Sequence, residues 1–489
     1  DALGGMGEQP STVYYISLRE GTLLSKGVRC FLTAGLIAVL WFMPIPDGLT
    51  PAAWHLFAIF AGTILGFILQ PFPLGTVALA AITFAALTNT IKPAEALAGF
   101  SNTVIWLIVS AFLFAQGFIK TGLGRRIAYC LILKFGSSSL KLAYTLVLSD
   151  FIIAPATPSN TARSGGILFP IVRSLASVFG SEPGATARRI GAFLLVVSFQ
   201  VDAPIAAAFL TACAPNPLMA ELARDTAGVE LSWGLWATAG IVPVLLSMIV
   251  LPYVLYKFYP PEIRETPEAQ SLAREKLAEM GRMTRDEKII CGIFVGALLL
   301  WSTSGYTGVN ATIAALLGVT AMLLTGVLTW EDVLKEKGAW DGMMWMGGVV
   351  SLAGALNKIG FIPWFAASVT GAMTGISWGL TLGILFLVYL YSHYGFASLS
   401  GHATAMYAAF LAVAVAAGAP PYLAALGLAF LSNLMAGLTH YSTGSAPIYF
   451  GAGYVTQEQW WRMGFLCSVI NILIWIGIGP VWWKLLGIW

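Results

Sequence analysis

A polar, proline-broken stretch between two short apolar segments places the strongest constraint on the fold. It covers residues 155–166, and apolar arms at 142–153 and 167–175 flank it. Each arm is shorter than the about 20 residues that a helix needs to cross a bilayer. Non-helical backbone at membrane depth is tolerated only where it is buried in protein or lines a wet cavity. The pattern therefore predicts a hairpin over 140–176 that enters the membrane and turns back, with its tip at a cavity.

Composition indicates the environment in which this hairpin folds. The chain has 489 residues, of which 58% are hydrophobic and only 10% are charged, and its mean hydropathy is +0.80. A soluble domain carries about 25% charged residues. The chain is therefore predicted to be an all-α polytopic membrane protein. Its net charge of +3 is too small to indicate a nucleic-acid partner.

The sequence contains no pattern typical of a cofactor, metal or catalytic site. Its five cysteines have neither metal-ligand spacing nor the arrangement of a disulfide framework. No nucleophile motif, nucleotide-binding loop or metal-spaced set of His and Cys residues is visible. We therefore expect no cofactor, no bound metal and no enzymatic activity, and no nucleotide-driven pump within this chain.

Apolar runs predict about eleven transmembrane helices plus two re-entrant hairpins. The chain divides into an N-terminal segment (1–27), a first half (28–257), a charged linker (258–287) with a helix at 267–280, and a second half (288–489). The predicted spans, broken segments and hairpins lie near 28–45, 51–70, 74–90, 102–135, 140–176, 190–220, 233–257, 288–304, 309–329, 338–372, 378–417, 421–450 and 461–485.

Basic residues predict the orientation of these spans. The loops at 46–51 and 302–309 hold no Lys or Arg, whereas the loops of the opposite side hold Arg125, Arg126, Lys134, Lys141, Arg173, Arg188, Arg189, Lys335, Lys337 and Arg462. By the positive-inside rule the basic side is cytoplasmic, together with the N-terminus and the linker. The first hairpin then opens inward and the second outward. We expect a bacterial inner membrane, with the plastid inner envelope as the alternative.

The two halves of the chain repeat one another. Matching segments cross in opposite directions under this span count, so the repeat is predicted to be inverted. Inverted repeats with broken helices at matched positions are typical of secondary transporters, whose substrates bind near the membrane midplane. The matched motifs are Thr90–Glu95 with Leu328–Asp332, Phe118–Leu123 with Leu356–Phe361, Ser159–Ala162 with Ser400–Ala403, and Thr211–Pro215 with Thr443–Pro447.

The two predicted hairpin tips supply the main candidates for substrate binding. The first tip offers the hydroxyls of Ser159 and Thr161, the amide of Asn160 and free backbone N–H groups. Such donors at a helix start bind carboxylates well. The alternative is ordinary helix capping by Ser and Asn. The second tip offers a matching set, which is Ser400, Gly401, His402 and Thr404.

Each tip has a basic side chain, Arg163 just after the first and His402 within the second. Arg163 cannot be neutralised at usable cost, so within a membrane it must meet an anion or a cavity. We expect it to face a dianionic substrate, and the alternative is a salt bridge to Asp150 or Asp202. His402 occupies the equivalent place in the second hairpin and is a candidate for substrate contact, with a hydrogen-bonded core role as the alternative.

Two further stretches break their helices with proline and small residues. Unwound backbone at such breaks closes the substrate site of many transporters, and the alternative is a simple proline kink. We expect substrate contacts from both breaks, namely from Thr211, Pro215 and Asn216 in the first and from Thr443, Ser445 and Pro447 in the second.

These residues resemble the divalent anion/sodium symporter family across nearly the whole chain, from about residue 28. Within it the chain looks closest to the exchanger branch, which contains bacterial citrate/succinate and tartrate/succinate antiporters and plastid 2-oxoglutarate/malate translocators. The resemblance implies a homodimer in which a transport domain moves as an elevator against a scaffold domain. The motifs that carry it are Pro158–Arg163, Thr121–Ala128, Phe396–His402, Leu438–Tyr441 and Gly444–Pro447.

One departure from the family pattern bears on ion coupling. The family's paired Ser-Asn-Thr signature is present at residues 159–161, but the second triplet reads Ser400-Gly401-His402. In the family's symporters, sodium ions beside the tips offset the substrate's charge. Here Arg163, and His402 in its protonated form, would provide built-in cations instead. Burying a dianion without compensating charge costs many kcal/mol. We therefore expect sodium-independent exchange of di- or tricarboxylates such as 2-oxoglutarate, malate, succinate and citrate. The alternatives are a sodium-coupled symporter and an anion channel.

Overall fold

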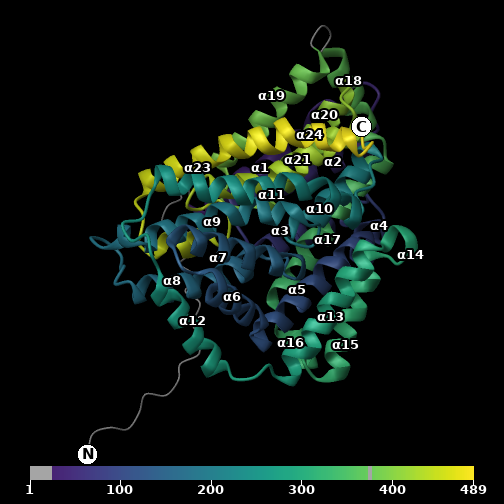
Figure 1. Ribbon diagram of the computed structural model, residues 1–489. Coiled ribbons are helices and arrows are strands. Elements are labelled where there is room, and N and C mark those ends of the chain that lie inside the picture. The colour runs from purple at the N-terminus through teal and green to yellow at the C-terminus, as the bar shows by residue number, and fades with distance from the viewer. Residues whose placement is uncertain (1–24, 373–376) are drawn as a thin grey trace, which may run out of the picture.

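The structure, a computed structural model, describes residues 25–372 and 377–489, so most of the predicted N-terminal segment lies outside it (Figure 1). Its first half contains α1 (Lys26–Phe42), α2 (Pro51–Leu69), α3 (Leu74–Leu87), α4 (Pro93–Ala96), α5 (Thr103–Thr121), α6 (Leu123–Phe135), α7 (Ser139–Ile153), α8 (Phe169–Val178), α9 (Gly191–Ala208), α10 (Pro215–Ala227) and α11 (Trp233–Phe258). After α12 (Pro267–Met280) come α13 (Arg285–Ser302), α14 (Ser304–Thr307), α15 (Ala311–Thr325), α16 (Trp330–Lys335), α17 (Lys337–Lys358), α18 (Phe361–Ala372), α19 (Trp378–Tyr391), α20 (Leu399–Ala416), α21 (Pro421–Leu434), α22 (Ala446–Gly451), α23 (Gln457–Ile472) and α24 (Gly479–Leu485).

The all-helical membrane fold is confirmed, because every named element in the described residues is a helix and many are apolar. Seven helical segments in this part of the chain are long and apolar enough to cross a membrane. The total of about eleven spans stays a prediction. The seven segments are Pro51–Leu69, Thr103–Thr121, Ser139–Ala156, Gly191–Ala208, Trp233–Phe258, Leu399–Ala416 and Gln457–Leu485.

One expectation about the first hairpin was wrong. The arm before its tip was predicted to be too short to cross a bilayer, but the helix from Ser139 to Ala156 has 18 residues and meets the requirement of length and hydropathy. It is longer because helix α7 includes the polar turn that precedes the apolar run, and because a 3₁₀ turn at Ala154–Ala156 continues it. Pro155 fits there, since the first turn of a helix has no use for its missing N–H group.

The linker between the halves contains the expected helix, α12, with the predicted bounds Pro267–Met280. It packs along α6. Arg126 of α6 donates two hydrogen bonds to the carboxylate of Glu287, at 2.6 and 3.1 Å, and one to the carbonyl of Gly281 at 2.9 Å. Arg126 therefore holds the end of the linker, from Gly281 to the first turn of α13, against the first half.

The helix packing has the reciprocity that a two-fold repeat requires. Helix α3 packs on α17, and α15 packs on α5, so each half contributes one short and one long helix to the other, while α5 and α17 also pack together. Figure 1 shows α13 and α15 side by side next to α5. If the helices of one half are replaced by their counterparts in the other, the α3–α17 pair becomes the α15–α5 pair. This symmetry supports the internal repeat.

Two ion pairs follow the same reciprocity. Glu95 is the third residue of α4, caps its first backbone N–H, and binds Lys358 at the end of α17 at 2.7 Å. Asp332 is the third residue of α16, caps that helix, and binds Lys120 at the end of α5 at 2.6 Å. An acid of each half therefore pairs with a lysine of the other half, at equivalent places.

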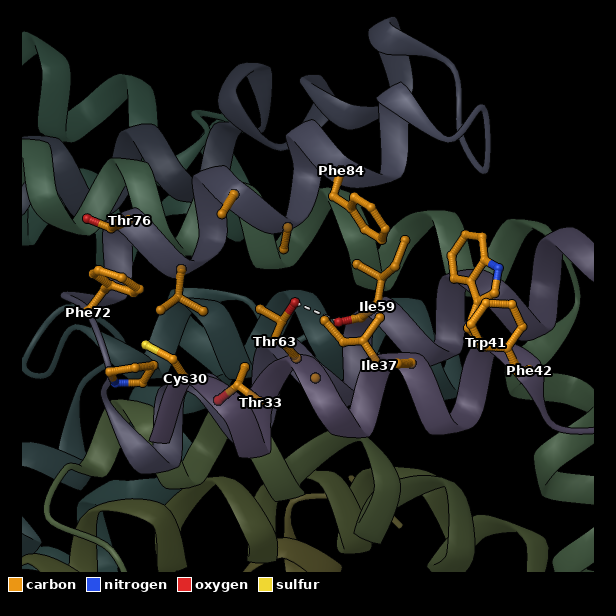
Figure 2. Close-up of a pocket in the computed structure, with 17 residues that line it drawn as sticks. Cys30, Thr33, Ile37, Trp41, Phe42, Ile59, Thr63, Phe72, Thr76 and Phe84 are labelled. Carbon is orange, nitrogen blue, oxygen red and sulfur yellow. Dashed lines mark hydrogen bonds between the residues drawn. The ribbon is translucent and has the colours of Figure 1, made fainter. Parts of the chain in front are cut away.

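An apolar groove of about 770 Å³ lies between α1, α2 and α3 (Figure 2). Cys30, Trp41, Phe72 and Phe84 lie along it, and the hydroxyl of Thr63 is bound to the carbonyl of Ile59 at 2.8 Å. Because no charged side chain lines this groove, it is unsuited to a dianion. The candidate site lies elsewhere.

The Lys120–Asp332 pair predicts a rescue by charge reversal. Its hydrogen bond lowers the pKa of Asp332 to about 2, so the carboxylate is ionised and the pair intact at neutral pH, and its stabilisation is lost only as the pH falls toward 2. Lys120→Asp should lower the melting temperature in detergent, by the equivalent of about 0.2–1 kcal/mol for the lost pair plus the repulsion between two carboxylates.

The double variant Lys120→Asp/Asp332→Lys restores the pair with its charges reversed, but it loses the cap that Asp332 gives α16. It should melt higher than Asp332→Lys, which loses the same cap without restoring the pair. The matched control reverses Lys335, whose partner Glu331 lies in the same helix, at 2.6 Å. Because that pair does not connect two helices, its reversal should change the melting temperature less. A double variant that melts no higher than Asp332→Lys would contradict the assignment.

Candidate functional site

The first tip joins α7 to a π-helix at Thr161–Leu168. Thr157 is extended, with φ −134° and ψ 95°, because a residue before proline avoids the helical conformation. Ser159 then restarts the helix, since its hydroxyl accepts a hydrogen bond from the N–H of Ala162 at 3.2 Å. Capping, the alternative left open by the sequence, thus describes Ser159. π-Helical turns occur frequently at functional sites.

The next two tip residues differ in their surroundings. Asn160 is 4% exposed, and neither its amide oxygen nor its amide nitrogen has a hydrogen-bond partner. Thr161 is exposed and faces Gly444 of the second break. A Cβ atom at Gly444 would lie 2.3 Å from the Thr161 hydroxyl, so only glycine fits there. The first tip and the second break are therefore in contact.

Arg163 is fully buried and bound by the protein itself. Its Nε donates to Asp150 and its Nη2 to Asp202, both at 2.7 Å. Its Nη1 donates to the carbonyls of Thr157 at 3.0 Å and Ala212 at 2.8 Å. Four of its five N–H groups are thus used. The structure shows the ion-pair alternative, and two carboxylates offset the charge that we expected to face a substrate.

In the second tip, His402 is completely buried at the start of α20. Its Nε2 lies 2.9 Å from the hydroxyl of Ser392, whereas its Nδ1 has no partner. The rings of Tyr389, His393 and Phe396 pack edge-on against it, with centroids 4.6, 5.2 and 4.6 Å away. One nitrogen thus fixes the ring, and the other is free for a ligand.

The two tips begin their second helix in the same way. Ser398 caps α20 through the N–H of Gly401 at 3.2 Å, as Ser159 caps the π-helix. The carbonyl of Ser398 accepts from the N–H of His402 at 3.0 Å, and that of Ser159 from Arg163 at 2.9 Å. Arg163 and His402 therefore occupy the same place relative to the capping serine of each tip. The match of Ser159–Ala162 with Ser400–Ala403 stays a prediction.

The other residues of the second tip make local contacts. Thr404 donates to the carbonyl of Ser400 at 2.7 Å, one turn earlier in the same helix. Gly401 is buried, but a Cβ atom there would meet its nearest neighbour, Ser398, at 3.6 Å, an ordinary contact. Ser400 is half-buried. Of the four predicted residues of this tip, only His402 has a buried side-chain polar atom without a hydrogen-bond partner.

The second break, residues 438–445, lies between the two tips. It meets the first tip through Gly444 and Thr161. It meets the second tip where the carbonyl of Ser442 lies 3.0 Å from Nε2 of His393. Ser445 is fully buried, and its hydroxyl has no partner. Pro447 is half-buried in the first turn of α22, and Thr443 is 7% exposed.

The first break, residues 209–214, supports the first tip. Thr211 donates to the carbonyl of Pro155 at 2.7 Å and accepts from the indole of Trp233 at 3.1 Å. Asn216 donates to the carbonyls of Ala206 and Phe209, at 2.9 and 3.0 Å, and its oxygen accepts from Asn433 at 2.8 Å. Pro215 is the buried first residue of α10. All of these groups are bound within the protein.

The unused polar atoms gather at the tips and the second break. Twelve buried side-chain N and O atoms in the described residues have no hydrogen-bond partner, and six of them belong to these three segments. Native proteins leave few such atoms unpaired, so a concentration of them indicates a ligand or ordered water. The six are both amide atoms of Asn160, Nδ1 of His393 and of His402, and the hydroxyls of Thr439 and Ser445.

The predicted site left out two members of this set. Thr439 lies in one of the motifs, but nothing in its spacing separated it from its neighbour His440, whose ring instead accepts from Trp461 at 3.1 Å. His393 lies in the 3₁₀ turn at Ser392–Gly395, where the second tip begins. The sequence does not show that this turn places Ser392 against His402.

Comparison with known proteins shows the family of the chain. Residues 24–489 match the family described as the sodium:sulfate symporter transmembrane region. YflS of Bacillus subtilis, which is named a candidate malate transporter, is 52% identical over 95% of this chain and 97% of its own. The chloroplast dicarboxylate transporter 1 of Arabidopsis thaliana is 50% identical over 95% of this chain and 84% of its own.

The fold is also that of a solved transporter. The YdaH transporter of Alcanivorax borkumensis has a TM-score of 0.50 at 13% identity, over 94% of this chain and 97% of its own. The expectation that the chain is a multi-pass membrane transporter and not an enzyme is confirmed by the family match. The chain belongs to the sodium:sulfate symporter family, which is the divalent anion/sodium symporter family that its motifs resemble.

Proposed function

We propose that the protein exchanges dicarboxylates across a membrane without sodium, and that the substrate binds between the two tips and the second break. The observation that carries this proposal is the set of six unused polar atoms there. The relatives named as malate and dicarboxylate transporters support the substrate class. In this proposal, malate, 2-oxoglutarate, succinate and citrate are the candidate cargoes.

The chemistry of the unused atoms suits a molecule with two carboxylates. The first tip offers the amide of Asn160, and the second tip offers the imidazoles of His393 and His402. The hydroxyls of Thr439 and Ser445 belong to the segment between them. Amide, hydroxyl and imidazole N–H groups all donate to carboxylates. A dicarboxylate with one end toward each tip would satisfy donors from all three segments.

The position of Arg163 supports independence from sodium. In transporters, unwound backbone carbonyls at broken helices coordinate the coupling ion. Here the guanidinium of Arg163 donates hydrogen bonds to the carbonyls of Thr157 and Ala212, which belong to the first tip and the first break. These two oxygens are then not available to coordinate a sodium ion. It acts by holding the tip and not by contacting the substrate.

Obligatory exchange follows in this proposal from the cost of an empty site. A buried polar atom without a partner costs about 1–3 kcal/mol. Six such atoms make movement of the empty site through the membrane unfavourable, and a bound dicarboxylate removes most of that cost. We propose further that the transport follows the elevator mechanism, in a homodimer with inverted halves at 28–257 and 288–489 and a cytoplasmic linker and N-terminus.

A sodium-coupled symporter is the second candidate, because the family description names sodium symport. The two mechanisms differ in the charge that they move. One-for-one exchange of equally charged dianions moves no net charge, whereas symport with excess sodium does. An anion channel, the third alternative, would show flux far above the turnover of a carrier.

Counterflow in proteoliposomes tests the proposal. With unlabelled malate inside and labelled malate outside, in sodium-free buffer, we expect label to accumulate transiently. The rate should not change when a potassium gradient with valinomycin imposes a membrane potential. Liposomes without internal dicarboxylate are the control and should accumulate little label. A strict requirement for sodium, or a strong response to potential, would favour symport.

A pair of asparagine variants separates substrate contact from structure. Asn160→Ala removes two unpartnered buried atoms, so it should not lower the melting temperature, and it should reduce exchange at least tenfold. Asn216→Ala removes three hydrogen bonds and should cost about 1–3 kcal/mol of stability. Melting in detergent and counterflow are measured on both. Wild-type exchange by Asn160→Ala would remove this residue from the site.

A further inference from the structure

Three charged side chains from three elements meet behind the first tip. Asp150 comes from α7, Arg163 from the π-helix and Asp202 from α9. They are 2, 0 and 1% exposed, and Arg163 binds each carboxyl group at 2.7 Å. The cluster is therefore sealed from water and held together by charged hydrogen bonds.

The charges in this cluster do not balance when both acids are ionised. Two carboxylates against one guanidinium leave a net charge of −1 in a fully buried place. The other titratable groups that face it are the thiol of Cys213, from the first break, and the hydroxyl of Tyr449, from α22. Both are neutral groups, and neither supplies a positive charge. An uncompensated buried charge costs several kcal/mol, even after relaxation.

The two carboxyl groups of the cluster lie close together. Asp150 and Asp202 bind neighbouring nitrogens, Nε and Nη2, of the same guanidinium. Oδ2 of Asp150 has no hydrogen-bond partner. Two carboxylates cannot hydrogen-bond unless one of them carries a proton. One shared proton would make the cluster neutral and give this oxygen a partner, as in other closely spaced carboxyl pairs.

We propose that the Asp150–Arg163–Asp202 cluster is a proton-binding site whose two carboxyl groups share one proton taken from water. The same guanidinium positions the carbonyls of Thr157 and Ala212, so the proton stabilises the first tip in its binding shape. Loss of the proton places a net negative charge behind the tip. That charge repels a dianionic substrate and weakens exchange, a consequence that rests on the proposed function.

Infrared spectroscopy of the purified protein tests the proton itself. With ¹³C-labelled aspartate, the wild type at neutral pH should show the carbonyl band of a protonated Asp side chain. The band should disappear in Asp150→Asn and in Asp202→Asn, because the remaining carboxylate then pairs with Arg163 one to one. Asp332→Asn is the matched control and should leave it unchanged, since Asp332 is ionised in its pair with Lys120. A wild type without the band would overturn the proposal, whether or not the variants fold.

The pH dependence of counterflow tests the link to transport. The wild-type rate should fall at alkaline pH by about tenfold per unit once the proton leaves, as for a single titrating group. Asp202→Asn should exchange with a flat profile, because its amide donates to Asp150 as the protonated acid does. An alkaline decline retained in Asp202→Asn would overturn the link. If neither the wild type nor any variant exchanges malate, the proposed function fails. The infrared band still decides whether the proton site exists.

Discussion

The burial of the Arg163 guanidinium is the interaction on which the first half of the site depends. A guanidinium in the core of a membrane protein must have its N–H groups bound, because no water is there to replace a missing acceptor. Its four bonds reach α7, the first tip, α9 and the first break. One side chain therefore holds together four segments, which are two helices and two irregular stretches. The backbone of the first tip can be irregular because Arg163 holds it through the carbonyl of Thr157.

Symmetry decides how the second half of the site is built. The capping serines, Ser159 and Ser398, place Arg163 and His402 at equivalent positions. Yet the two residues have different surroundings, since one meets two carboxyl groups and the other a hydroxyl and three aromatic rings. The same backbone thus carries a fully bound cation at one tip and an imidazole with a free nitrogen at the other. The binding surface is asymmetric although the scaffold repeats.

Much of the architecture was predictable from the sequence, because apolar runs and breaks are visible without contacts. The linker helix, the helical segments and the repeat all follow from hydropathy and from motif spacing. The capping serine of the second tip was not predicted, since a serine at 400 resembles the cap as closely as the one at 398 does. Only the hydrogen bond to Ser398 distinguishes them. Arg163 was expected to face the substrate, because spacing cannot show that both Asp150 and Asp202 reach it. His393 and Thr439 were left out of the predicted site, because the sequence does not show which buried polar atoms lack a partner.

The second break contacts both tips, the first through Gly444 and the second through Ser442. In the proposed elevator mechanism, two tips that contact one segment would travel together. A pocket that moves without changing its shape would offer equal affinity to cargo arriving from either compartment. The direction of net flux would then be set by the ratio of concentrations across the bilayer, and not by any bias within the polypeptide.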